Sequence, residues 1–212
     1  MANKIYTIGR EFGSGGKQVG EKLAERLGIK LYDKELLQQA AKDSGFCEEI
    51  FENHDEKPTN SFLYSLVMDT YSVSGYSAAP FLDMPLNHKV FLAQFETIKK
   101  IAEQESCVIV GRCADYALAE NPDCINVFIH ADMDFRIRNI CKKLDVTDNK
   151  ARDIINKTDK QRASYYKYYT SKKWGDAKSY NLSLDAGKIG IDNCVEMILK
   201  YRELMDNMKN NQ

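Results

Sequence analysis

The sequence predicts an α/β fold in which helices flank both faces of a parallel β-sheet, and three observations support this prediction. Short apolar runs alternate with amphipathic helical stretches along most of the 212-residue chain, which is the pattern of βαβ units. One run, residues 107–110, is apolar throughout and ends in Gly111, as expected of a central strand buried on both faces. A glycine-rich loop, residues 9–16, joins the first expected strand to the first expected helix.

The first elements follow from periodicity and from glycine. Residues 5–8 form a short β-rich run. Residues 17–27 carry apolar side chains at helical spacing, and Gly28 is well placed to end that helix. Residues 29–32 then predict a second strand, and residues 34–42 a second helix.

Residues 44–86 show little periodicity, because prolines, glycine and scattered aromatic residues interrupt it. The pattern indicates a short helix over 62–67 and a loop over 71–79. We therefore expect a small insert over the core here rather than a second domain.

The second half returns to alternating helices and strands, so the whole chain, 1–212, is expected to form one domain. A highly charged, tyrosine-rich stretch at about 147–175 is the candidate for a helical lid. The expected elements are helices over 88–104, 113–119, 133–144, 147–168 and 190–208, and strands over 107–110, 125–129 and 180–184.

Net charge, apolar runs and cysteine spacing argue against several classes of partner and site. The formal net charge is -1, so nothing global favours nucleic acid or an anionic membrane as a partner. The sequence has neither an apolar secretory core nor a run of about 20 apolar residues, so we expect a soluble, cytoplasmic protein. Its six cysteines form no C-x-x-C pair and have no histidine at metal-ligand spacing, which favours buried reduced thiols over disulfides or zinc.

The glycine-rich loop, GREFGSGGK over residues 9–17, is the strongest functional signal. Glycines let the chain turn with its N–H groups inward, and the following helix adds a positive dipole, so the loop is a candidate phosphate cradle. The alternative is a turn without a ligand. The candidate phosphate-binding residues are Gly9, Arg10, Gly13, Ser14, Gly15, Gly16, Lys17 and Gln18.

The loop departs from the P-loop motif G-x-x-x-x-G-K-[ST]. If Gly16 and Lys17 are aligned with the G-K pair, Glu11 replaces the first glycine and Gln18 replaces the hydroxyl residue. If the glycines at 13 and 15 are aligned instead, Gly16 occupies the lysine position. Either Lys17 reaches the phosphates from one residue later, or Arg10 or a lid residue supplies the charge.

Charged residues follow two other expected strands, at the sheet edge where α/β folds bind ligands. Gly111 and Arg112 follow the central strand, and the guanidinium could grip a phosphate or pair with a carboxylate in a structural role. Asp115 could face the same ligand or favour a helix start. Asp33, after the second strand, could orient an acceptor, hold magnesium through water, or cap the next helix.

The candidate lid carries Lys160 and Arg162, followed by paired tyrosines. Cations that close over a transferring phosphoryl group stabilise its transition state. The alternative is a solvated charged face. Arg136, in the helix after the 125–129 strand, could reach a bound nucleotide or pair with an acid.

Four stretches carry a family resemblance. They resemble the bacterial cytidylate kinases, and more closely the cytidylate-kinase-like proteins related to them. The stretches are residues 8–16, 31–36, 108–115 and 159–162, the last followed by Tyr165 and Tyr166.

The resemblance implies a three-layer P-loop NTPase-type fold, ATP with Mg²⁺ as the donor, and CMP or dCMP as the acceptor. It implies that Gly111, Arg112 and Asp33 contact the acceptor, and that Arg162 with Lys160 covers the phosphates. Cytidylate kinases carry lysine where Gly16 falls, so this sequence departs from their pattern in the loop.

These features together predict phosphoryl transfer with Lys17, Arg112, Lys160 and Arg162 as the catalytic residues. No metal-ligating residue is assigned. Two alternatives remain: a kinase of the same fold for another small metabolite, and a nucleotide-binding regulatory module without turnover. The partners expected are small-molecule nucleotides, and the segment 44–86 either covers the acceptor or forms a homodimer contact.

Overall fold

Five parallel strands form a single sheet in the order β2-β3-β1-β4-β5. The computed structural model describes residues 3–45, 48–56 and 85–210. The strands are β1 (Ile5–Arg10), β2 (Lys30–Tyr32), β3 (Cys107–Val110), β4 (Cys124–His130) and β5 (Leu182–Asp185).

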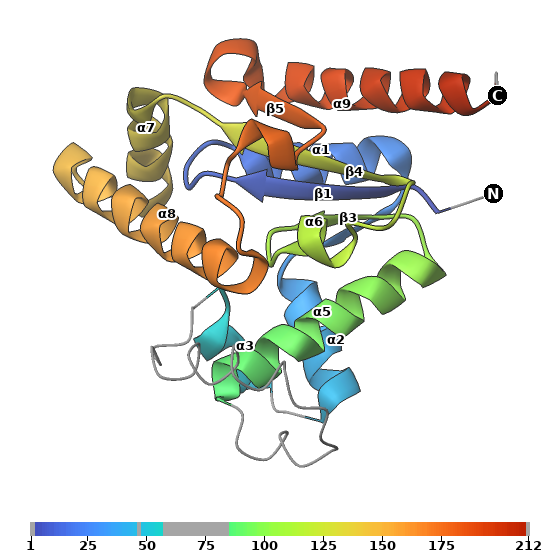
Figure 1. Cartoon of the computed structure of the whole chain (residues 1–212). Helices are drawn as coiled ribbons and strands as arrows, with labels where there is room; N and C mark the ends of the chain where they lie inside the picture. Colours follow the sequence, from blue (N-terminus) through green and yellow to red (C-terminus); the bar gives the residue numbers. More distant parts are fainter. Residues whose placement is uncertain (1–2, 46–47, 57–84, 211–212) are drawn as a thin grey trace.

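Helices cover both faces of the sheet (Figure 1). On one face, α1 (Gly16–Leu27) and α9 (Ala186–Asn210) pack on the strands through a core that includes Tyr6 and Ile8. The other face packs on a second core that includes Ile5 and Ile109. Its helices are α2 (Lys34–Ser44), α5 (Leu86–Gln104) and α6 (Ala114–Ala117).

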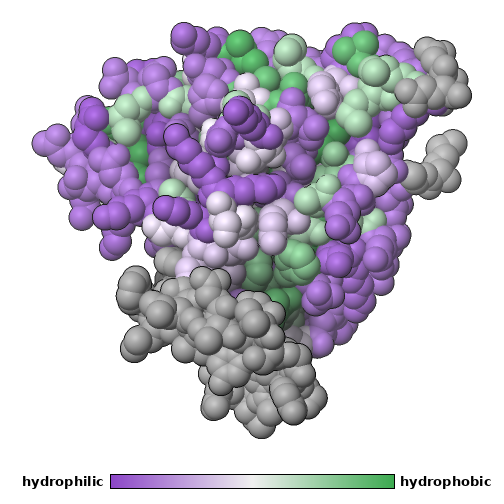
Figure 2. All heavy atoms as spheres, in the orientation of Figure 1, coloured by the Kyte–Doolittle hydropathy of each residue, from purple (hydrophilic) through white to green (hydrophobic). Residues whose placement is uncertain are grey.

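The arrowhead of β1 points toward α7 and α8 in Figure 1, so the carboxyl end of the parallel sheet faces these two helices. The surface over them is mostly hydrophilic (Figure 2). The remaining elements are α3 (Glu48–His54), α7 (Met133–Leu144), α8 (Asp148–Thr170) and the 3-10 helix η1 (Ala177–Ser179).

The pairing of β1, β2 and β3 places the expected site residues at the same end of the sheet. Ile8 of β1 lies opposite Val110 of β3, so the residues after both strands leave the sheet side by side. Tyr32 of β2 lies opposite Ile109, which brings Asp33 to the same edge. The loop after β1 and the chain after β2 and β3 therefore open toward one space.

The structure confirms the predicted three-layer fold, and two of the helices differ from their predicted bounds because of backbone conformation. Cys113 has a left-handed backbone (φ 56°), so α6 begins one residue later than predicted and ends at Ala117. The last helix contains a non-helical residue, Gly190 (φ 79°, ψ 163°), which is where the sequence predicted its start. The helix expected over 62–67 and the loop expected over 71–79 lie outside the described residues.

Five cysteines within the described ranges are free thiols, and all but Cys141 are buried, as expected. Cys47 lies outside those ranges. No helix in the described part of the chain is both long and apolar enough to cross a bilayer.

Candidate functional site

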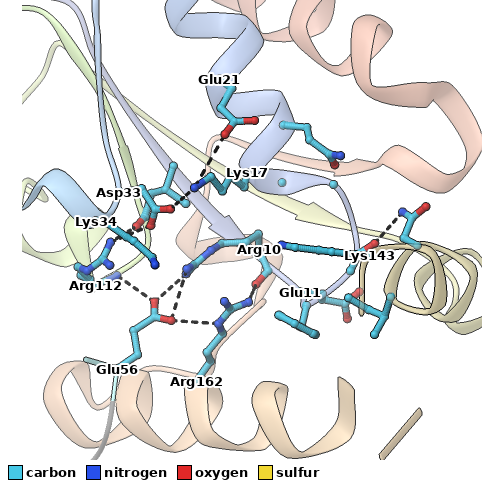
Figure 3. Close-up of a pocket in the computed structure, with 18 of the residues that line it drawn as sticks. Arg10, Glu11, Lys17, Glu21, Asp33, Lys34, Glu56, Arg112, Lys143 and Arg162 are labelled. Carbon is cyan, nitrogen blue, oxygen red and sulfur yellow. Dashed lines mark hydrogen bonds and ion pairs between the residues drawn. The ribbon is translucent and has the colours of Figure 1, made fainter. Parts of the chain in front are cut away.

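A pocket of about 980 Å³ opens at the carboxyl end of the sheet, between the loop after β1 and helix α8 (Figure 3). Its size suits a nucleotide-sized ligand. Most of the predicted site residues line it. They are Arg10, Gly13, Gly15, Gly16, Lys17, Gln18, Asp33, Arg112 and Arg162.

Helix α7 holds the loop in place by bonding two of its carbonyl groups. Arg136 Nε donates to the Phe12 carbonyl at 2.9 Å, and Asn139 Nδ2 donates to the Gly13 carbonyl at 2.9 Å. Gly13 (φ 83°) and Gly15 (φ 90°) adopt left-handed conformations that favour glycine. Among the described residues, no acceptor bonds the N–H of Gly13 or Gly15, and the dipole of α1 adds to their positive potential.

Two predicted site residues, one in the loop and one in α7, stabilise this shape from behind. Ser14 is buried, and its Oγ lies 2.9 Å from the Glu11 carbonyl oxygen and 3.1 Å from that of Ile129. Arg136 is also buried and forms ion pairs with Glu11 and Asp159. Both side chains therefore support the loop, and neither lines the pocket.

Lys17 faces the pocket, but its ammonium group is paired with a carboxylate, that of Asp33, which lies just after β2. Its Nζ lies 2.8 Å from Asp33 Oδ2 and 3.8 Å from Glu21 Oε1 (Figure 3). The hydrogen bond to Asp33 raises the pKa of Lys17, and the side chain remains 49% exposed. Asp33 makes this contact instead of a capping bond to α2.

Glu56, just after α3, joins two of the pocket's guanidinium groups. Its Oε1 lies 2.7 Å from Arg10 Nη1, and its Oε2 lies 3.0 Å from Arg162 Nε. The backbone N–H of Arg112 also donates to Oε1, at 3.3 Å. Burial raises the pKa of Glu56, but Arg10 and Arg162 outweigh burial and hold that pKa far below its usual range. The carboxylate is therefore ionised at neutral pH.

Arg112 is buried among carboxylates. Its Nε and Nη2 form a two-pronged contact with Asp55 at 2.9 and 2.8 Å. Its Nη1 donates to Asp33 and to the Val110 carbonyl, each at 3.1 Å. Of the two roles that the sequence left open, the structure shows the carboxylate pairing. Arg112 fixes two acids on the pocket wall, and its own left-handed backbone (φ 54°) is part of that arrangement.

The other predicted residues lie outside the main pocket. Asp115 is buried beside a separate small cavity and accepts a hydrogen bond from the Tyr166 hydroxyl at 2.6 Å. Gly9 and Gly111 line that same small cavity. Lys160 is exposed on α8.

Sequence reasoning missed Asp55 and Glu56, which supply two of the acids in the pocket wall. They lie in the segment 44–86, where periodicity gives no register, and no local motif marks them. The basic residues Lys34, Lys142 and Lys143 also line the pocket. No group of three or more potential metal ligands is found among the described residues.

Known structures share this fold. An uncharacterized protein from Eubacterium ventriosum ATCC 27560 is 33% identical, with 95% of this chain and 99% of that chain covered and a TM-score of 0.71. Shikimate kinase from Bacteroides thetaiotaomicron is 14% identical, with 94% and 98% covered and a TM-score of 0.54. A gluconokinase from Sinorhizobium meliloti 1021 is 12% identical, with 99% and 97% covered and a TM-score of 0.52.

A search of curated proteins found no match. The cytidylate kinase-like family, in contrast, matches residues 5–188, which include the loop, Asp33, Arg112 and Arg162. This chain, with its P-loop kinase fold, belongs to the cytidylate kinase-like family.

Proposed function

We propose that this protein transfers the γ-phosphoryl group of ATP, bound with Mg²⁺, to a small-molecule acceptor. One observation carries the proposal: the inward N–H groups of the loop and two guanidinium groups, those of Arg10 and Arg162, face the same pocket. Phosphoryl transfer depends on positioning and on stabilising negative charge, and this arrangement provides both.

The donor half of the pocket fits a triphosphate. The N–H groups of Gly13 and Gly15 and the first turn of α1 would hold phosphate oxygens. Arg10 and Arg162 would neutralise the charge that develops on the transferring group. Asp33 and Asp55 are the carboxylates that would hold Mg²⁺, which needs only one or two protein ligands of this kind and would supply positive charge beside the phosphates.

For the acceptor, CMP or dCMP is the first candidate. Membership of the cytidylate kinase-like family supports it. A nucleoside monophosphate attacks through a phosphate oxygen that is already ionised, so no strong base is required. Asp33, whose pKa is lowered by Lys17 and Arg112 despite its burial, would then orient the acceptor rather than remove a proton.

The second candidate is a hydroxylated metabolite without a phosphate group. The wall around Arg112 presents Asp33, Asp55 and Glu56, and the Arg112 guanidinium is bonded to two of them. Carboxylates disfavour a dianionic phosphate and suit hydroxyl groups, which donate hydrogen bonds to them. Two proteins that share the fold are a shikimate kinase and a gluconokinase.

An acceptor panel tests the proposal. ADP release is measured with ATP and Mg²⁺ for CMP, dCMP, UMP and AMP, and in parallel for shikimate and gluconate. We expect turnover with one class, and Arg162→Ala should lower kcat about 10²–10³-fold. ATP binding by calorimetry without product from any acceptor would instead support a regulatory module. Absence of ATP binding would contradict the proposal.

A further inference from the structure

We propose that Arg10 supplies the cation that lysine supplies in other P-loops, and that Arg10 and Gly16 are a reciprocal exchange of two motif positions. The inference rests on the proposed function, because it assigns a ligand of the donor phosphates. It accounts for two of the three departures of this loop from the P-loop motif, those at positions 10 and 16, with one physical contact.

The two departures lie at fixed positions of the motif. With Gly15 as the second glycine of G-x-x-x-x-G-K-[ST], Arg10 stands where the first glycine belongs and Gly16 stands where the lysine belongs. The chain thus has both residue types that the motif requires, at each other's positions. The helix α1 begins at Gly16, as expected for the lysine position at a helix start.

The side chain of Arg10 passes directly over Gly16. A Cβ atom on Gly16 would lie 3.1 Å from Arg10 Cγ and nearer still to Arg10 Cβ. Gly16 does not have a positive φ, so its backbone would accept any residue. Arg10 is therefore the nearest obstacle to a side chain at position 16, and Ile129 Cβ is the next, at 3.3 Å.

A second glycine makes room for the guanidinium group. A Cβ atom on Gly111, after β3, would lie 2.8 Å from Arg10 Cζ and nearer still to Nη1. The Arg10 side chain is 11% exposed and runs from the end of β1 to the space between the loop and α8. The absence of a side chain at both glycines leaves room for the Arg10 side chain. Arg10 therefore reaches the pocket from the end of β1 (Figure 3).

The Arg10 guanidinium lines the pocket and retains N–H donors that could bind an anion. Of its five N–H donors, two bond the carboxylate of Glu56, at 2.7 and 3.4 Å, which leaves three. Among the described residues, no other acceptor bonds them. Arg162 shares the same carboxylate, so an anionic group is already bound between the two guanidinium groups.

Lys17, the alternative cation, is less well placed. Its ammonium group is bonded to Asp33 at 2.8 Å and is half exposed on the side of α1. By the same alignment it occupies the position of the metal-binding hydroxyl, one residue past the lysine position. Arg10 is therefore the cation that faces the loop's inward N–H groups.

The test exchanges the residues at positions 10 and 16 and measures the binding of ATP with Mg²⁺ by calorimetry. This measurement needs no acceptor. Arg10→Gly should weaken binding about 10- to 100-fold, because a charge-assisted contact is lost. Gly16→Lys should weaken it similarly, because lysine collides with Arg10. The double variant Arg10→Gly/Gly16→Lys restores the motif as GEFGSGK and should bind at least tenfold more tightly than either single variant. Arg26→Ala, an exposed arginine of α1 paired with Glu196, is the control and should bind as the wild type does.

A second arm tests the contact without nucleotide. Gly16→Ala should lower the midpoint of thermal unfolding in the wild type and lower it much less in an Arg10→Gly background, because Arg10→Gly removes the Cβ atom that lies nearest to position 16. An equal loss in both backgrounds would overturn the steric argument. Wild-type affinity in Arg10→Gly, or a double variant no better than the weaker single variant, would overturn the inference while leaving the proposed function intact. If the wild-type protein does not bind ATP, both the inference and the proposed function are wrong.

Discussion

Glu56 is the residue on which the cations of the pocket converge. It contacts the guanidinium groups of Arg10 and Arg162 and the backbone of Arg112. These partners come from β1, from α8 and from the chain after β3, so one carboxylate joins three parts of the fold. Its charge matters more than its packing, because without it two neighbouring guanidinium groups repel each other.

Replacing Glu56 by glutamine should lower the free energy of unfolding by about 2 kcal/mol at pH 7, because two charged donors lose their anionic partner. The pKa of Glu56 is lowered in the folded state. Its contribution is therefore present above the unfolded pKa of about 4.3 and is lost as the pH falls toward the folded pKa. The gap between the two proteins should shrink below about pH 4.3, measured by denaturant unfolding at pH 7 and pH 3.5.

Glu203→Gln is the matched control, since Glu203 is exposed and pairs only with Lys200 on its own helix, as far as the described residues show. It should change stability by less than about 0.5 kcal/mol at either pH. A gap for Glu56→Gln that stays constant with pH would show that the effect comes from packing and not from charge.

At this scale the sequence predicts the loop and Asp33 but not how the charges pair. Arg112, Lys17 and Asp33 are each visible from strand ends and motif spacing. Their pairing depends on Asp55 and Glu56, which come from a segment without periodicity. A sequence pattern gives the edge of a sheet that a residue occupies, whereas pairing depends on which acid lies within about 3 Å.

At the scale of elements, α7 acts as a clamp on the phosphate-binding loop. Arg136 and Asn139 bond two successive loop carbonyls from outside. The peptide groups are thereby fixed with their N–H groups toward the pocket. The helix itself is capped by Asp132, whose side chain accepts from the Phe135 N–H at 2.8 Å.

Asn139→Ala should weaken ATP binding about tenfold while changing the free energy of unfolding by only about 1 kcal/mol. The reason is that one loop peptide is released to rotate, although no core side chain is lost. Calorimetry and thermal unfolding of the same sample give both quantities. Asn193→Ala, which removes a similar amide-to-carbonyl bond within α9, should leave ATP affinity unchanged; equal affinity losses in the two variants would refute the clamp.

Helix α8 is anchored on helix α6 by a partly buried hydrogen bond between the Tyr166 hydroxyl and Asp115. Tyr166→Phe should lower the free energy of unfolding by about 1–3 kcal/mol, because a buried carboxylate loses a donor. Burial raises the pKa of Asp115, so this carboxylate opposes folding as the pH rises. The loss should therefore be greater at pH 7.5 than at pH 5, as measured by denaturant unfolding.

Tyr168→Phe on the same helix is the control, since its ring packs edge-on against Tyr169 and the described contacts give its hydroxyl no hydrogen bond. A loss for Tyr166→Phe no larger than that for Tyr168→Phe would show that the bond to Asp115 does not anchor α8.

The elements themselves follow closely from periodicity and from glycine. Most expected strands and helices appear within about two residues, because each buries one apolar face that the sequence repeats. The last helix is the clearest exception, since it includes residues before Gly190 that carry no helical pattern. Helix α6 is short because Arg112 and Cys113 both have left-handed backbones, which periodicity cannot reveal.

For the whole molecule, the groups that line the pocket suit a phosphate better than a nucleobase. The features described above are N–H groups, guanidinium groups and carboxylates at one sheet edge. ATP with Mg²⁺ at 100 times its Kd should raise the midpoint of thermal unfolding by roughly 5–10 °C, whereas adenosine should raise it by less than about 1 °C. A comparable shift with adenosine would show that the base provides most of the affinity.

Asp33 would couple the affinities of the ligands that bind in the donor and acceptor halves of the pocket. Its two oxygens are divided between Lys17, on the helix that follows the loop, and Arg112, on the acceptor wall. A triphosphate that attracts Lys17 frees one of these oxygens toward the acceptor. Each ligand would thus change the other's affinity by the same factor, through a single shared carboxylate and without any movement of the sheet.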